Sequence, residues 1–267
     1  GALSHCTLRQ GGNASSVEPY RAGVVVKDVG GVGVSFTSCS FSDAGRPAWV
    51  VRSRVSFVSC SFTNAGDWPL TVEGASSVLE MTGCSFTGNT RDRVLVVNGA
   101  LTGQSFTLRK QTALDAYYLQ GRFVVPDGVT MTLEPGVKVV GSQNEELKVL
   151  GHLEAAGTVA DPITFTAAGN DWTGLIVAGT GSARLDHCVV EKGGNSSSVD
   201  PYRTSLAVVG VQSGSVSVRN STLRGPVRGA WVVDSRVSFA DTVFTGAGEW
   251  PLTVEGASSV LEMTGCS

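Results

Sequence analysis

Six cysteines are the residues of this chain whose type could hold a metal ion or form disulfide bonds. No two of them lie within four residues of each other, whereas zinc sites and redox motifs place cysteines two to four residues apart. The spacing therefore predicts no metal site and no cofactor. Cysteine without such partners usually behaves as a small buried residue.

Three of the cysteines are followed by serine and then phenylalanine, as in Cys60-Ser-Phe62. This alternation places cysteine and phenylalanine on the same buried face of a strand. In an internal repeat of the chain, Cys39 and Cys60 correspond to Ser221 and Thr242, so a hydroxyl replaces the thiol. We therefore predict a core ladder of reduced, buried side chains without disulfides. Its members are Cys6, Cys39, Cys60, Cys84, Cys188, Cys266, Phe41, Phe62 and Phe86.

Three histidines are the other candidates for catalysis. His5 and His187 each stand directly before a cysteine, so they point outward if the cysteine points inward. His152 stands alone in an apolar stretch. None lies in a local motif that joins a nucleophile, a base and a carboxylate. We predict solvated wall residues and no catalytic residue.

The composition restricts the class of protein. Charged residues make up 16% of the chain, glycine contributes 34 of 267 residues, and the formal net charge is -3. This argues against helical bundles and gives no basic surface for nucleic acid. No apolar run is long enough to span a bilayer, so we expect no membrane insertion by this segment.

A long repeat organises the chain. Gly11-Gly12-Asn13 returns as Gly193-Gly194-Asn195, and the same offset maps Trp49 onto Trp231. We therefore expect one continuous β-solenoid over residues 1–267. Residues 1–182 form its first long unit, and residues 183–267 form a partial second copy.

A shorter repeat within this unit indicates the coils of the solenoid. The Cys-x-Phe pattern recurs about every 20–25 residues, with one longer spacing, which is the period of a solenoid coil. Alternation in Val55-Ser-Phe57 changes parity before Cys60, which predicts a tight bend between two short strands. The predicted fold is all-β, a parallel β-helix of about 11–12 coils with no capping helix.

Polar residues that the repeat retains differ from those that it loses. Asp43 and Asn64 become Gly225 and Gly246, so they are interpreted as turn residues rather than as a calcium site. We predict that the retained residues form ion pairs along the stack, with a sugar-binding face as the alternative. They include Arg46/Arg228, Arg54/Arg236, Asp67/Glu249, Glu73/Glu255 and Glu80/Glu262.

An insertion at residues 11–21, repeated at 193–203, lengthens one coil. Loops that leave a solenoid wall often carry contacts, and tyrosine, tryptophan and arginine suit recognition. The alternative is a loop that covers a flank of the solenoid. The possible contact residues are Tyr20, Arg21, Tyr202, Arg203, Trp68 and Trp250.

The middle of the chain resembles a known family. Phe123-Val-Val-Pro-Asp-Gly128 leads toward Pro162-Ile-Thr-Phe-Thr166 and Leu185-Asp-His-Cys188. These motifs are similar to modules of large bacterial secreted and cell-surface proteins with right-handed parallel β-helix repeats. With the Cys-x-Phe coils, the resemblance covers nearly the whole chain. It implies a right-handed coil, in agreement with the usual crossover preference, and an extracellular or bacterial cell-surface location.

Enzymes that share this type of fold have catalytic strings that are missing here. Resemblance to pectate lyases would imply stacked aspartates for calcium, and resemblance to polygalacturonases would imply Asn-Thr-Asp, Asp-Asp and Gly-His-Gly. None of these strings occurs in the sequence. The sequence therefore favours a protein that is not an enzyme.

We expect an extracellular structural β-solenoid, a segment of a surface stalk, fibre or filament with a structural or adhesive role. Its expected partners are copies of itself, end to end or side by side, or other cell-surface polymers. The alternatives are a carbohydrate-active β-helix, either a polysaccharide lyase or a glycoside hydrolase, and a non-catalytic polysaccharide-binding module.

Overall fold

The computed structural model describes residues 1–11, 21–97, 99, 101–194, 200–212, 215–246 and 248–267. The chain divides into two compact units, which we call unit 1 (Gly1–Tyr118) and unit 2 (Leu119–Ser267). Throughout the described ranges, the regular structure is β-strand, and no α-helix occurs. Accordingly, no helix of the described part is a candidate for a membrane span.

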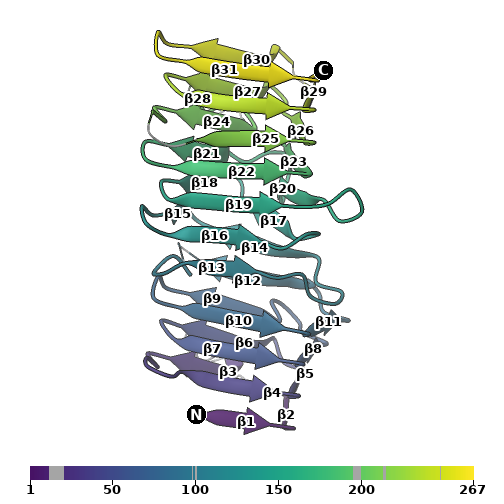
Figure 1. Cartoon of the computed structure of the whole chain (residues 1–267). Coiled ribbons are helices and arrows are strands. Elements are labelled where there is room, and N and C mark those ends of the chain that lie inside the picture. Colours follow the sequence, from purple (N-terminus) through teal and green to yellow (C-terminus); the bar gives the residue numbers. More distant parts are fainter. Residues whose placement is uncertain (12–20, 98, 100, 195–199, 213–214, 247) are drawn as a thin grey trace. The chain divides into compact units, whose positions relative to one another are not determined.

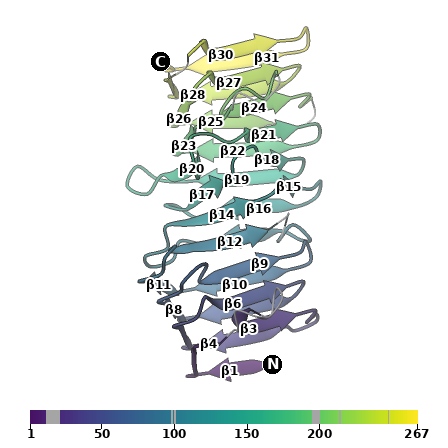
Figure 2. The same ribbon diagram turned by 180° about the vertical axis from the view of Figure 1, so that it is seen from behind.

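Unit 1 consists of coils that each add one strand to each of three parallel sheets (Figures 1 and 2). Two further strands, β13 (Phe106–Leu108) and β14 (Ala116–Gln120), follow these coils. The strands of the first sheet are β1 (Ala2–Ser4), β4 (Val34–Thr37), β7 (Arg54–Val58) and β10 (Val78–Thr82). Those of the second are β2 (Thr7–Arg9), β5 (Ser40–Ser42), β8 (Ser61–Thr63) and β11 (Ser85–Thr87). Those of the third are β3 (Ala22–Lys27), β6 (Arg46–Val51), β9 (Leu70–Glu73) and β12 (Arg93–Val97).

Unit 2 repeats this arrangement with three further sets of parallel strands (Figure 1). The first set is β16 (Thr130–Leu133), β19 (His152–Ala156), β22 (Ser182–Asp186), β25 (Val216–Arg219), β28 (Arg236–Ala240) and β31 (Val260–Thr264). The second is β17 (Lys138–Gly141), β20 (Ile163–Ala167), β23 (Cys188–Glu191), β26 (Thr222–Arg224) and β29 (Val243–Thr245). The third is β15 (Phe123–Val125), β18 (Glu146–Val149), β21 (Gly174–Ala178), β24 (Leu206–Val209), β27 (Arg228–Val233) and β30 (Trp250–Glu255).

The predicted all-β, parallel solenoid is therefore confirmed, with about ten coils in the described residues. Coil length varies along the chain, as the one longer Cys-x-Phe spacing indicated. Val34 pairs with Val55, whereas Ala2 pairs with Ser35, which is a much longer step along the chain. Long coils accommodate more residues in their turns while the strands stay in register.

A single residue in the left-handed region produces the bend that the change of parity predicted. Ser59 lies between β7 and β8 with φ 52°, and Ser38 has φ 53° at the same place in the preceding coil. One such residue reverses which side chains face inward. Both Phe57 before the bend and Phe62 after it therefore point into the core, where both are fully buried.

Aromatic rings stack from coil to coil inside unit 1. The ring of Phe62 stacks on Phe41 at 4.9 Å and on Phe86 at 4.8 Å between centroids, with interplanar angles of 8° in both pairs. All three side chains are 0% exposed. Stacked aromatic pairs add about 0.5–1.5 kcal/mol to the gain from burial, so this column holds neighbouring coils together.

The central ring of this column should be the most sensitive. We expect Phe62→Ala to lower the free energy of unfolding by about 3–5 kcal/mol, because it leaves a cavity between two coils. Val32, which is 96% exposed, provides the control, since Val32→Ala should change stability by less than about 0.5 kcal/mol. Urea unfolding measures both; equal effects of the two substitutions would contradict the stacked core.

Candidate functional site

The outward face of unit 2 carries a connected set of polar side chains, which we call the polar strip. On β19 and β22 alternate residues such as Leu153 and Leu185 are fully buried, so the residues between them face outward. His187 and Asn220 occupy the left-handed turn positions that follow β22 and β25. The polar strip consists of His152, Glu154, Ser182, Arg184, Asp186, His187 and Asn220.

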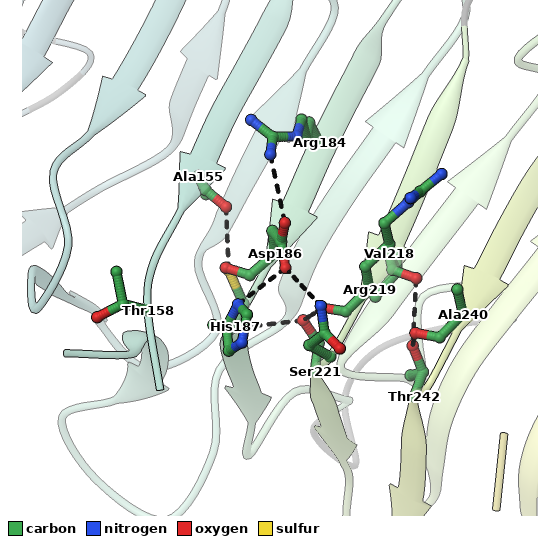
Figure 3. Close-up of polar contacts among 12 residues, drawn as sticks. Ala155, Thr158, Arg184, Asp186, His187, Val218, Arg219, Ser221, Ala240 and Thr242 are labelled. Atoms are coloured by element: carbon green, nitrogen blue, oxygen red, sulfur yellow. Dashed lines mark hydrogen bonds and ion pairs between the residues drawn. The ribbon is translucent and has the colours of Figure 1, made fainter. Parts of the chain in front are cut away.

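Asp186 is the centre of one half of the polar strip (Figure 3). Its carboxylate lies 2.9 Å from His187 Nδ1, accepts a hydrogen bond of 3.0 Å from Asn220 Nδ2, and lies 3.3 Å from Arg184 Nη2. Burial alone would raise the pKa of Asp186. The Asn220 hydrogen bond and the nearby positive charges outweigh burial, so the pKa lies below its usual value.

Arg184 joins Asp186 to Glu154 of the neighbouring coil. Its Nη1 donates to Glu154 Oε1 at 2.6 Å, while its Nη2 faces Asp186. An arginine is permanently charged, so Arg184 attracts both carboxylates and links the two coils.

His152 and Ser182 form the other half of the polar strip. His152 Nδ1 lies 2.8 Å from Ser182 Oγ, and His152 Nε2 lies 3.5 Å from Glu154 Oε2. The two residues are paired in register, with His152 on β19 and Ser182 on β22. A serine, an imidazole and a carboxylate therefore follow one another across two coils.

Glycines hold the start of these two strands close to the preceding coil. A Cβ on Gly151 would lie 2.2 Å from the carbonyl oxygen of Pro126, and a Cβ on Gly181 would lie 2.3 Å from that of Val149. Only glycine permits this approach. Each glycine directly precedes one of the pair, His152 or Ser182, so the backbone fixes where both side chains begin.

The long repeat compares only Arg184, Asp186, His187 and Asn220 of the polar strip, because residues 183–267 are matched with residues 1–85. At the offset that maps Trp49 onto Trp231, Arg184 and Asp186 correspond to Ala2 and Ser4, and only His187 keeps its type, as His5. The strip therefore occurs once in the described residues. The histidines were predicted to be isolated wall residues, and the strip was not predicted because its members are about one coil apart in the chain.

The repeat does reproduce ion pairs between neighbouring coils. Arg46 Nε lies 2.8 Å from Asp67 Oδ2 in unit 1, and Arg228 Nη2 lies 2.6 Å from Glu249 Oε2 in unit 2. Arg54 likewise meets Glu80 at 2.8 Å. These contacts run along the stack, as the retained residues predicted.

Each arginine of the repeated pairs also covers a buried tryptophan. The guanidinium carbon of Arg46 lies 4.7 Å from the ring centroid of Trp49, and that of Arg228 lies 3.9 Å from Trp231. Both contacts are cation–π interactions on the outer side of the coil. Aspartate in one copy and glutamate in the other serve the same structural contact.

The residues proposed for contacts belong to both units. In unit 1, Trp68 is half-buried, with its ring 5.1 Å from Tyr118 and the Arg91 guanidinium carbon 5.0 Å from its centroid. Arg21 is exposed, and Tyr20 lies outside the described residues.

In unit 2, the described part of the insertion packs on its own chain. Arg203 Nη2 lies 3.8 Å from Glu249 Oε1, and Asp200 Oδ1 lies 3.5 Å from Arg228 Nη1. Tyr202 is half-buried, whereas Trp250 is 64% exposed. These contacts favour the alternative in which the inserted loop covers a flank of the solenoid.

Asp43 and Asn64 lie in turns, as interpreted from the repeat. Both have left-handed backbone angles, with φ 56° and 55°, and Asn64 Nδ2 donates to Asp43 Oδ1 at 3.1 Å. In the described ranges, no three His, Cys, Asp or Glu side chains gather in a way that could hold a metal ion.

The four buried cysteines of the ladder contact backbone carbonyls of the preceding coil. The thiols of Cys60 and Cys84 lie 3.4 Å from the carbonyl oxygens of Phe36 and Phe57. Thr242 Oγ1 makes the equivalent contact of 3.2 Å to Val218 (Figure 3). A thiol and a hydroxyl can both donate here, which explains why the repeat exchanges them.

Burial differs along the ladder. Cys39, Cys60, Cys84 and Cys188 are buried and free, whereas Cys6 and Cys266 are free but only half-buried. Those two were predicted to be buried; their coils pack against one neighbouring coil in the structure. Burial raises the pKa of Cys188 to about 12, so this thiol stays protonated at neutral pH.

Comparison with known proteins is informative for part of the chain. Residues 100–200 match a family model described as "Pectate-lyase like beta helix domain". No curated protein and no solved structure matches the chain. The match and the parallel sheets together identify this chain as a right-handed parallel β-helix repeat protein.

Asp186 should make stability depend on pH. Because its pKa is lower in the folded chain than the usual 3.8, its contribution is present above that pH and is lost as the pH falls through the folded value. We expect Asp186→Asn to cost about 1 kcal/mol at pH 7 and less at pH 3. The exposed Asp127 gives a control variant, Asp127→Asn. An equal loss at both pH values in urea unfolding would contradict the assignment.

The thiols provide a second test. We expect six thiols after denaturation, of which the four buried ones react with a thiol reagent only after unfolding, because the reagent cannot enter the core. Titration with and without denaturant measures this. Two or more disulfides in the native protein would refute the reduced ladder.

Proposed function

We propose that this chain is a structural segment of an extracellular fibre, stalk or filament, with a wall that adheres to other surface polymers. The observation that carries the proposal is what the long repeat keeps. It keeps the Arg46–Asp67 and Arg228–Glu249 pairs, the tryptophans that they cover, and the carbonyl contacts of the ladder. All of these interactions join one coil to the next.

Repetition of such contacts extends a solenoid without adding chemistry. Each coil stabilises its neighbours, so the number of coils can grow while each contact stays the same. The change of Arg184 and Asp186 to Ala2 and Ser4 in the other copy therefore supports a scaffold that the repeat conserves and a wall that it leaves free to change.

Electron microscopy of the native material tests the structural role. We expect rods or filaments many times longer than one chain of 27.6 kDa, stained on the cell exterior by an antibody against this segment. An antibody raised against an unrelated cytoplasmic protein of the same cells is the control. Compact, monodisperse particles that stay inside the cell would contradict the proposal.

The polar strip favours a second candidate, a carbohydrate-active or carbohydrate-binding β-helix. Six of its seven members lie within the stretch that matches the pectate-lyase-like model, and they occupy one place on one wall. Hydroxyl, amide, guanidinium and carboxylate groups are those that hydrogen-bond sugars. This arrangement supports binding of an extended polysaccharide along the coils.

We expect binding without cleavage of glycosidic bonds, because Glu154 and Asp186 are both paired with Arg184. Incubation with pectin or alginate, with and without calcium, should release no unsaturated or reducing ends. Affinity electrophoresis through the same polymers should show retardation that Arg184→Ala weakens and Arg54→Ala does not. Turnover that disappears in Glu154→Gln would instead establish the enzyme.

A further inference from the structure

We infer that Ser182, His152 and Glu154 form a surface site for hydrolysis of small acyl esters. This inference goes beyond the structural role and does not rest on it. It is carried by the 2.8 Å contact between Ser182 Oγ and His152 Nδ1 and by the 3.5 Å approach of His152 Nε2 to Glu154 Oε2. A serine beside a base that a carboxylate orients is the arrangement of an activated nucleophile.

The contacts assign a role to each side of the imidazole. In the tautomer in which Nδ1 accepts a hydrogen bond from the Ser182 hydroxyl, the N–H of the imidazole is on Nε2, facing Glu154. Glu154 is itself held by Arg184 Nη1 at 2.6 Å. Glu154 is therefore a positioning residue, which acts through His152, and Ser182 is the catalytic nucleophile.

The rigid backbone places the pair before any substrate arrives. Gly151 and Gly181 hold the start of both strands against the preceding coil, and Ser182 N–H donates to Gly151 O at 2.9 Å. His152 and Ser182 are opposite partners in the parallel ladder. A nucleophile and its base on neighbouring strands lose little freedom when they react.

The surroundings indicate the substrate class. The side chain of His152 is 39% exposed and that of Arg184 is 50% exposed, so the site is open to solvent. Arg184 lies two residues along the same face of β22, where its charge can stabilise an oxyanion. An open wall of this kind suits a short acyl group, of acetyl size, attached to an extended polymer with hydroxyl groups.

The reaction balances through one covalent intermediate. Ser182 Oγ attacks the ester carbonyl carbon while His152 takes the hydroxyl proton. The bond from the carbonyl carbon to the alcohol oxygen then breaks, and His152 returns the proton to the leaving alcohol. Water adds to the acyl-serine with His152 again as the base, and the carboxylic acid leaves as Ser182 Oγ recovers its proton.

The test uses the full chain and two probes, a fluorophosphonate that reacts with activated serines and p-nitrophenyl acetate. We expect the fluorophosphonate to label Ser182, as located by mass spectrometry of the labelled peptide. Ester hydrolysis should fall by about 100-fold or more in Ser182→Ala and in His152→Gln. Ser217→Ala is the matched control, because Ser217 lies on the adjacent strand and contacts Arg219 rather than a histidine.

The role of Glu154 is tested by a measurement that would not change if the residue were purely structural. Glu154→Gln should lower the rate of labelling at Ser182, and Glu154→Asp should restore part of that rate. Both variants should have the same thermal unfolding midpoint as Arg54→Ala, a control that breaks a comparable surface ion pair. Wild-type protein that is not labelled at Ser182, or Ser182→Ala with the wild-type rate of ester hydrolysis, would overturn the inference. Because labelling is measured on the wild-type chain, the test holds even if a variant fails to fold.

Discussion

Hydrogen bonding between successive coils is the constraint on which the rest of the structure depends. Ser61 N–H donates to Cys39 O at 2.9 Å, and Ser85 N–H donates to Cys60 O at 2.9 Å. Such bonds join residues of neighbouring coils. A coil that lacked a neighbour would therefore have unpaired backbone N–H and C=O groups. Because strands pair parallel and in register, each position in a coil lies on the equivalent position of the next.

Because of this register, side chains at equivalent positions form columns along the stack. The columns inside the coil and those on the wall are under different physical constraints. Inside the coil, a column is stable when like side chains stack, as Phe41, Phe62 and Phe86 do. Outside, a column of like charges would repel, and the observed columns place arginine against aspartate or glutamate. The inner columns set stability, whereas the outer wall can acquire new groups at little structural cost.

Because outward-facing residues can change without disturbing the core, a scaffold and a reactive site can occur in one chain. The polar strip uses outward positions of β19 and β22, while Leu153 and Leu185 of the same strands remain fully buried. Substitutions on the wall leave the inner columns intact. The structural role proposed for the chain and the ester-hydrolysing site proposed on unit 2 therefore place no competing demands on the core.

The sequence was sufficient to predict the columns but not the register between distant coils. Alternation around Phe57 and Cys60 predicted the strands, the bend at Ser59 and the inward ladder, because these depend on neighbouring residues. The step along the chain from His152 to its partner Ser182 is longer than the step from Val34 to Val55. With coil length varying in this way, the sequence could not show which residues of the middle coils face each other, and the polar strip was missed.

Residue-resolved hydrogen exchange tests the dependence on inter-coil bonding most directly. The account predicts that the amides of Ser59, Ser61 and Ser85, which donate to Thr82, Cys39 and Cys60, exchange slowly and open together. The amide of Val159, in a loop where the residue is 86% exposed, should exchange far faster. Rapid exchange at Ser61 and Ser85 in the native protein would contradict the in-register stack from which the scaffold and its wall are built.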